Sequence, residues 1–472
     1  MKKNNVLLYL MIVVSIILCI PSILYLVNNK TVDGFDAYYT YTLVKSNNVT
    51  IGMLNGIIVI GLLLVFSIIY LLIIKNEKQI FKNKKQIMVF IFIISFIFMM
   101  ILPFLSSDIY YYIGDSWLAS KYGENPYYTT VKDLQDKGIN DEILNNTGYW
   151  KNTVSVYGPL YNMIATCLSN MSLGNITVAL FIFKIASLLV HVLNSYLMYK
   201  ITKSNKYMLL YGLNPLVLIE LLSNVHNDIY LILFILLSLY FLIRKKNICF
   251  TVIFLVLSIA IKYSTVLIVP FILIYCFKDK NISKRILYCL ITGISIMVLV
   301  IMFYLPYYRD ISIFTNMLVQ GERYSQSIMA LLFVKLNQNY LFKMINTFKL
   351  PIFALIYIIT LLQVLVKRNI NLKYIIKKYN IIMIIFIFVV LTNFQKWYVL
   401  WLLPTIIWQN KNMRKFILAL TITAIIPSFK YFEIENDTFI HGIYYSLNII
   451  LFSTIIVLIN IIKTKRRIKC QD

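Results

Sequence analysis

Two aspartates stand where a long apolar run of this chain ends. Asp108 follows the segment 103–107, and Asp115 comes about two helical turns farther along. Partial burial at the end of a membrane span raises the pKa of a carboxylate and makes it a better base. We therefore predict Asp108 as a general base, with a solvated loop acid as the alternative. Asp115 is predicted as a supporting residue that either shares this chemistry or shapes the loop.

A polar triplet, His226-Asn227-Asp228, separates two other apolar runs. Polar side chains between membrane helices are costly and usually have a function. The triplet either binds a phosphate or sugar or caps a helix end. A metal site is disfavoured because no second histidine lies at ligand spacing. We predict that His226 and Asp228 bind a donor substrate, with Asp228 orienting His226 and Asn227 supporting them.

Two positively charged residues could bind a phosphate group of a substrate. Lys262 interrupts the apolar run 248–277 and either extends to the membrane interface or meets an anion. Arg323 offers a planar guanidinium for phosphate oxygens, although a loop arginine is solvated by default. Both are predicted as phosphate-binding residues.

Aromatic residues accompany these charges. Tyr112 lies in a tyrosine-rich segment after Asp108, and Trp397 follows Lys396. Such residues either form an aromatic belt at the membrane interface or stack on a sugar. Tyr112, Lys396 and Trp397 are predicted as supporting residues.

The elements that must position these residues are membrane helices. The chain is 60% apolar with a mean hydropathy of +0.78, and its repeated apolar runs of about 20 residues are long enough to cross a bilayer. We predict an all-α integral membrane protein with a polytopic bundle of about 14 transmembrane helices. The first run, 6–27, resembles a signal peptide but is longer and lacks a small-residue cleavage site, so we expect it to be retained. The expected spans are 6–27, 51–74, 87–105, 175–199, 207–222, 228–243, 249–261, 264–277, 286–305, 347–366, 379–394, 397–409, 414–428 and 442–462.

Basic clusters predict the orientation of these helices. Lysines and arginines crowd the segments 75–85 and 463–469, and the positive-inside rule places both segments and the two termini in the cytoplasm. The predicted active site then lies on the outer face. Residues 106–174 form an outer loop in which 158–173 is an interfacial helix or re-entrant segment. We expect one integral membrane domain, residues 1–472.

Composition argues against several other classes. The six cysteines lack the paired spacing of a disulfide framework or a zinc site, so no metal and no cofactor are predicted. The net charge of +26 reports membrane orientation, and no nucleic acid partner is expected.

These motifs together resemble a known family. The segments 103–112 and 123–127 are similar to the first catalytic loop of bacterial integral-membrane glycosyltransferases of the GT-C class, in particular the polyprenol-phosphate-mannose-dependent alpha-mannosyltransferases. The later motifs follow in the same order, between residues 103 and 404. They are Val156 to Leu160, Asn214-Pro215 with His226 to Asp228, Lys262 with Pro270, and Trp397-Tyr398 with Trp401 and Pro404.

The resemblance implies an inverting, metal-independent hexose transfer on the outer face of the cell membrane. The donor would be a polyprenyl-phosphate-linked sugar, with mannose implied by the family. The acceptor would be a glycolipid, glycopolymer or glycoprotein. Asp108 matches the family's proposed base, and Asp36 on an earlier loop is a minor competitor.

Two alternatives differ in chemistry. A transporter or flippase of a lipid-linked saccharide would place its polar residues at the membrane midplane, whereas here they map to one face. A polymerase or ligase would use a diphosphate-linked oligosaccharide, and only the donor distinguishes it from the predicted enzyme.

Overall fold

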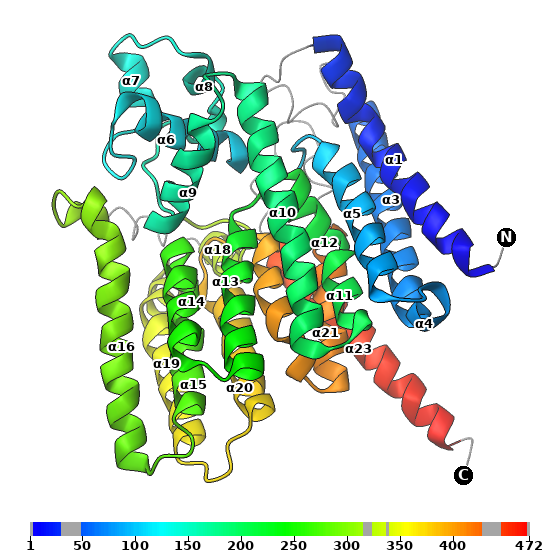
Figure 1. Cartoon of the computed structure of the whole chain (residues 1–472), viewed down its shortest axis with the longest axis vertical. Coiled ribbons are helices and arrows are strands. Elements are labelled where there is room, and N and C mark those ends of the chain that lie inside the picture. The colour runs from blue at the N-terminus through cyan, green and yellow to red at the C-terminus, as the bar shows by residue number, and fades with distance from the viewer. Residues whose placement is uncertain (1–2, 30–48, 315–322, 337–338, 427–444, 470–472) are drawn as a thin grey trace. The chain divides into compact units, whose positions relative to one another are not determined.

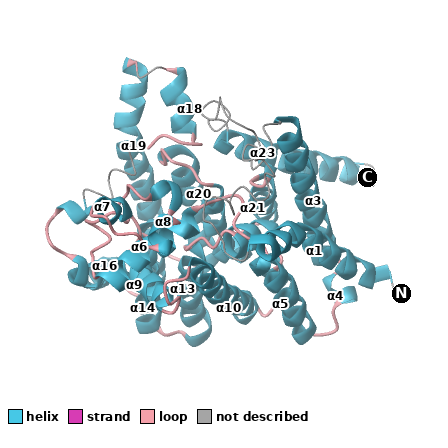
Figure 2. Cartoon of the chain, turned by 90° about the horizontal axis from the view of Figure 1, so that it is seen from above, coloured by secondary structure: helices cyan, strands magenta, loops and turns pink. Residues whose placement is uncertain are grey.

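The computed structural model describes residues 3–29, 49–314, 323–336, 339–426 and 445–469. Within these ranges the chain is helical, and its only β pairings are isolated bridges (Figure 2). The prediction of an all-α membrane protein is confirmed in this respect. Asp36 lies outside the described residues.

Helix lengths do not support the predicted count of about 14 spans. Five helices of the described residues are long and apolar enough to cross a membrane, and a bent pair with an angle of 119° brings the number to six. The other predicted crossings correspond to shorter helices, or to helices interrupted by 3₁₀ and π segments. The five are Asn5–Asn28, Ile57–Lys75, Ile176–Thr202, Ile282–Tyr307 and Tyr340–Leu365, and the bent pair is Pro215–Ser223 with Asp228–Lys245.

The chain divides into two compact units. The first contains the described residues of Met1–Thr265 and Ile296–Met317. The second contains those of Val266–Ser295, Leu318–Lys430 and Glu435–Asp472.

Apolar helices build the frame of the first unit. Asparagine side chains cap several of them; Asn175, for example, accepts a hydrogen bond from the Val178 amide at the start of α10. Helix α10 packs against α5, α11 and α13, and α13 packs against α14 (Figure 1). The helices of this frame are α1 (Lys3–Asn29), α3 (Val49–Lys75), α4 (Glu77–Ile80), α5 (Lys84–Met100), α10 (Ile176–Thr202), α11 (Asn205–Gly212), α12 (Pro215–Val217), η2 (Leu218–Ser223), α13 (Asp228–Tyr240), η3 (Phe241–Lys245) and α14 (Ile248–Ile261).

The predicted outer segment folds into short helices of the same unit. They are α6 (Asp108–Tyr122), α7 (Val131–Asp136), α8 (Glu142–Asn145), η1 (Gly148–Trp150) and α9 (Pro159–Asn170). Helix α9 has 12 residues and is therefore about 18 Å long, which is too short to cross a bilayer core. It packs against α6 and α14.

The second unit is also helical. In it, α15 packs against α19 and α20, while α21 packs against α23 and η8. Its helices are α15 (Val269–Cys276), α18 (Ile328–Lys335), α19 (Tyr340–Leu365), α20 (Leu372–Ile385), η7 (Phe386–Val390), η8 (Lys396–Trp408), α21 (Lys411–Thr423) and α23 (Tyr445–Lys469). Two helices, η4 (Tyr263–Ile268) and α16 (Ile282–Tyr304), contain residues of both units, and η5 (Leu305–Tyr307) belongs to the first.

Candidate active site

Asp108 is the first residue of α6, after the extended segment that follows α5. Its amide donates a hydrogen bond to the Ser106 hydroxyl at 3.3 Å. The partial positive charge of a helix N-terminus stabilises a carboxylate at this position. The side chain is 20% exposed, so the carboxylate is largely desolvated and still reachable from outside.

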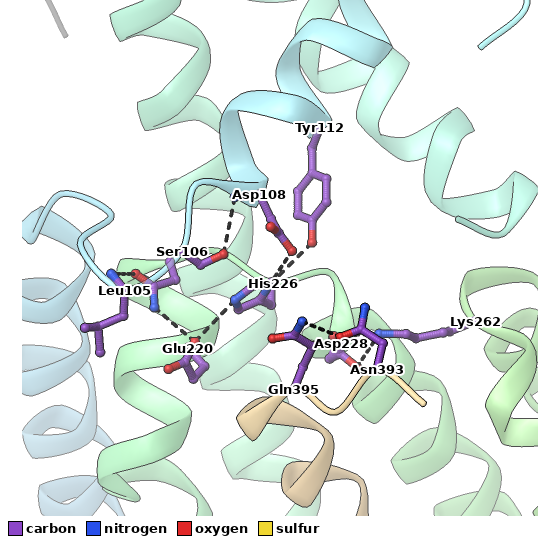
Figure 3. Close-up of polar contacts among 11 residues, drawn as sticks. Leu105, Ser106, Asp108, Tyr112, Glu220, His226, Asp228, Lys262, Asn393 and Gln395 are labelled. Atoms are coloured by element: carbon purple, nitrogen blue, oxygen red, sulfur yellow. Dashed lines mark hydrogen bonds and ion pairs between the residues drawn. The ribbon is translucent and has the colours of Figure 1, made fainter. Parts of the chain in front are cut away.

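His226 lies at the break in the bent helix pair, between η2 and α13. Its side chain is fully buried. The Nδ1 atom of His226 lies 3.7 Å from the Asp108 carboxylate and 3.4 Å from the Tyr112 hydroxyl (Figure 3). The preceding residue, Val225, has a φ of 58°, which is strained for a β-branched residue. Strain of this kind clusters at functional sites.

A second carboxylate lies on the other side of the imidazole. Glu220 is fully buried, and its Oε2 atom lies 3.2 Å from Nε2 of His226 (Figure 3). The side-chain amide of Asn224 donates a hydrogen bond to the same Oε2 atom at 3.0 Å. Sequence reasoning missed Glu220. A charged residue within the apolar run 215–222 is nevertheless the same kind of sequence feature that singled out His226.

Lys262 forms an ion pair with Asp228. Its Nζ atom lies 3.1 Å from each carboxylate oxygen, and Asp228 is fully buried (Figure 3). From the sequence we expected Asp228 to lie against His226, but Glu220 lies there instead, and Asp228 pairs with Lys262. Asn227 is also buried, and its side-chain amide has no hydrogen-bond partner among the described residues.

A buried lysine joins the two segments that carry Asp108 and His226. The Lys184 Nζ atom donates to the carbonyl oxygens of Ile101 at 2.7 Å, Leu222 at 3.2 Å and Ser223 at 2.8 Å. An ammonium has three N–H donors, and all three are used here. The carbonyls belong to the ends of α5 and η2, where helical partners are lacking.

Asn224 reinforces this junction. Its side-chain oxygen accepts hydrogen bonds from the amides of Phe104 and Leu105 at 3.2 and 3.3 Å. Sequence reasoning missed both Lys184 and Asn224.

The charges around Asp108 affect its basicity. Burial raises the pKa of the Asp108 carboxyl, while the positive charges of His226 and Lys262 and the Ser106 hydrogen bond lower it; burial has the larger effect. A raised pKa makes the ionised carboxylate a stronger base toward a hydroxyl proton.

Gly158 places α9 against the end of α14. Its amide donates to the Ile261 carbonyl at 3.1 Å, and a Cβ atom at Gly158 would lie 2.1 Å from the Ala260 carbonyl oxygen. Only glycine permits this approach, which fixes the backbone directly before Lys262.

Residues 12–278 match the family described as alpha-(1->6)-mannopyranosyltransferase, N-terminal domain. The chain belongs to this MptA_B family. Membership confirms the resemblance to GT-C mannosyltransferases and identifies the protein as a membrane glycosyltransferase. No curated protein and no solved structure matches the chain.

The MptA_B match contains the whole cluster around Asp108 and His226. Arg323, Lys396 and Trp397 lie beyond it, in the second unit. There the Ser325 amide donates to the Thr392 carbonyl at 3.1 Å, which brings these two positions together. Lys396 and Trp397 begin η8 and are buried, and Arg323 is half-buried.

Asp115 is buried on α6 and lines a small cavity together with Tyr112, whose hydroxyl lies beside His226. Among the described residues, no group of three or more His, Cys, Asp or Glu side chains is arranged to hold a metal ion.

Proposed function

We propose that this MptA_B protein transfers mannose from a polyprenyl-phosphate donor to an acceptor hydroxyl, with inversion at the anomeric carbon. The observation that carries the proposal is the Asp108 carboxylate, desolvated yet 20% exposed, beside His226 in a family of mannosyltransferases. A base of raised pKa next to cations suits a reaction that deprotonates a hydroxyl and releases a phosphate.

In the proposed step, Asp108 removes the proton of the acceptor hydroxyl as the acceptor oxygen bonds to the anomeric carbon. The bond between that carbon and the donor phosphate oxygen breaks, and its electron pair leaves with the lipid phosphate. Attack from the face opposite the phosphate inverts the anomeric centre. Asp108 ends the step as a carboxylic acid and returns its proton to water.

Cations stabilise the departing phosphate. Lys262, held by Asp228, and His226, held by Glu220, supply positive charge in the first unit. We propose that Arg323 also binds the donor phosphate, and that Tyr112, Asn227, Lys396 and Trp397 support donor binding.

The whole chain is proposed to act as one enzyme of the cell membrane. Its basic clusters favour cytoplasmic termini and an active site on the outer face. The acceptor is proposed to be a glycolipid, glycopolymer or glycoprotein of the cell envelope.

The proposal is tested with radiolabelled polyprenyl-phosphate mannose. Membranes containing wild type, Asp108→Asn or Asp136→Asn are incubated with this donor and a lipid extract of the host. Wild type is expected to form a labelled product, and Asp108→Asn to be slower by about 10²–10⁴-fold, the usual contribution of a general base. Asp136, an exposed acid of α7, is the matched control and should be dispensable.

Three results would contradict parts of the proposal. Full transfer by Asp108→Asn at equal abundance removes Asp108 as the base. Transfer only from a diphosphate-linked oligosaccharide identifies a polymerase or ligase. Absence of transfer from either donor, with translocation of a lipid-linked saccharide across proteoliposomes, identifies a transporter.

A further inference from the structure

A small cavity lies between α6 and α9, beside the candidate active site. Its volume is about 10 Å³, which is the space that one oxygen atom of a hydroxyl or a water needs. Three tyrosines line it, with ring centroids 4.9 Å apart for Tyr112 and Tyr157 and 5.2 Å apart for Tyr112 and Tyr161. Tyr112 also contacts His226, so this cavity adjoins the residues around Asp108.

Two buried polar groups face this cavity without using their full hydrogen-bonding capacity. Asp115 and Asn162 both line it, with exposures of 4% and 5%. Oδ1 of Asp115 and Nδ2 of Asn162 have no hydrogen-bond partner among the described residues. The other ends of both side chains are held by Ser155, whose hydroxyl donates to Oδ1 of Asn162 at 3.1 Å and hydrogen-bonds to Asp115.

We propose that Asp115 and Asn162 form a subsite for one hydroxyl group of the acceptor sugar. The inference rests on the proposed glycosyl transfer and specifies where the acceptor is recognised. A hydroxyl both donates and accepts, so it can donate to Oδ1 of Asp115 and accept from Nδ2 of Asn162 at once. Leaving two such groups buried and unsatisfied is costly, and a ligand that completes them is favoured.

The character of the lining favours a neutral sugar over a cation. Burial raises the pKa of Asp115 well above its ordinary value, against the opposing hydrogen bond with Ser155, and so disfavours the charged carboxylate that a cation would need. Tyrosine rings offer apolar faces to the C–H groups of a sugar. Only the hydroxyl oxygen need enter the cavity, since its volume excludes a whole sugar ring.

The test uses sugar probes and the full-length protein in detergent. Saturation-transfer NMR titrations measure the Kd of methyl α-mannopyranoside and its four monodeoxy derivatives. In wild type, removal of one particular hydroxyl is expected to weaken binding by about 10-fold, because the buried groups then lose their partner. In Asp115→Ala and Asn162→Leu, the parent sugar should bind about 10-fold more weakly, and this deoxy derivative should bind like the parent.

Thr166→Val is the matched control. Thr166 lines the same cavity, but its hydroxyl already donates to the Asn162 carbonyl at 2.7 Å, so the control should keep the wild-type discrimination. Thermal unfolding of every variant is recorded. If Asp115→Ala or Asn162→Leu fails to fold, Ser155→Ala is used in its place, because it removes the hydroxyl that holds Asp115 and Asn162 and leaves both side chains present.

The subsite is refuted if wild type binds no methyl mannoside, or if the variants discriminate among the deoxy sugars as wild type does. If the variants lose thermal stability but bind the sugar as wild type does, the cavity holds a resident water, and the subsite is also refuted. Mannosyl transfer is measured separately with Asp108→Asn, so transfer without this discrimination rejects the subsite and leaves the proposed function intact.

Discussion

The carboxylate of Asp108 lies 3.7 Å from Nδ1 of His226, and Glu220 lies 3.2 Å from Nε2 on the other side of the ring. The histidine is thus placed between two acids, one largely buried and one fully buried. Its contact with Asp108 joins the start of α6 to the break between η2 and α13. The positive charge of His226 lowers the pKa of Asp108 and partly offsets the larger effect of burial.

His226→Gln tests this coupling through the pH dependence of transfer. Without the ring's positive charge, the pKa of Asp108 rises further, because burial then acts with less opposition. A general base must be ionised, so activity increases as pH rises through this pKa. The acidic limb of the profile of kcat/KM against pH is therefore expected to move to higher pH.

His191→Gln is the control for this experiment. His191 is also fully buried, on α10, and its Nε2 atom lies 3.1 Å from the Gly212 carbonyl oxygen. Its variant should keep the wild-type pH profile. An unchanged acidic limb in His226→Gln would show that His226 does not tune the base.

Lys184→Met removes the ammonium that joins the ends of α5 and η2. Three buried carbonyls lose their donor, and we expect the free energy of unfolding to fall by roughly 3 kcal/mol. Because these carbonyls belong to the segments leading to Asp108 and His226, kcat should fall by at least about 10-fold even at temperatures where the variant is folded.

The matched control for this change is Lys200→Met, a lysine near the end of the same helix whose Nζ lies over the Tyr196 ring. It should leave kcat unchanged. Lys184→Arg, which keeps a charged donor, should recover part of the activity. A folded Lys184→Met protein with wild-type kcat would show that the lysine only stabilises the frame.

Sequence reasoning identified those residues of the candidate site that stand out against apolar surroundings. Asp108, His226 and Lys262 each interrupt or end an apolar run, and the cost of such a residue in a membrane indicates a function. The pairing of these residues was not predictable. The chain bends by 119° after η2, where Glu220 meets His226, and the polar residues between the two apolar runs do not indicate the angle of that bend.

Lys184 escaped prediction for a related reason. It lies inside a single apolar run that is long enough to span the membrane, and its partners are backbone carbonyls, which carry no sequence signal. The helices of the described residues do not support the predicted number of spans, because apolar content alone does not indicate how long each helix is. Helix η8, for example, is largely apolar after Lys396 but is a 3₁₀ helix that contains Pro404.

Gly158→Ala tests the contact between α9 and α14. The new methyl group would lie 2.1 Å from the Ala260 carbonyl oxygen and 2.7 Å from that of Ile261, so the backbone must move. We expect a loss of about 1–3 kcal/mol in the free energy of unfolding, the usual cost of overpacking. Displacement of the residue before Lys262 should also raise the KM for the donor.

Gly61→Ala provides the comparison, because nothing lies within 4 Å of a Cβ at Gly61 in α3. It should unfold at the same temperature as wild type or slightly higher. Equal stability and equal donor KM in Gly158→Ala and wild type would refute the close packing.

Asp141 connects helices α6 and α8 of the outer segment, and its replacement is expected to change only the stability of the protein. Its carboxylate accepts hydrogen bonds from Lys121 at 2.7 Å, from Trp117 at 3.1 Å and from Tyr122 at 2.9 Å. It also caps α8 through the amides of Ile143 and Leu144. Burial opposes ionisation, but these hydrogen bonds outweigh it and lower the pKa of Asp141.

Asp141→Asn should therefore reduce the free energy of unfolding by about 2 kcal/mol at pH 7. A carboxyl whose pKa is lower in the folded state stabilises the protein above its unfolded pKa, about 4, and this contribution is lost as pH falls through the folded pKa. The Tm difference between wild type and Asp141→Asn should accordingly shrink on acidification below pH 4. Intrinsic tryptophan fluorescence follows the unfolding transition. Asp136→Asn, which changes an exposed ion pair, should leave the Tm nearly unaltered. A Tm difference that stays constant from neutral to acidic pH would mean that the charge of Asp141 contributes nothing to holding α6 and α8 together.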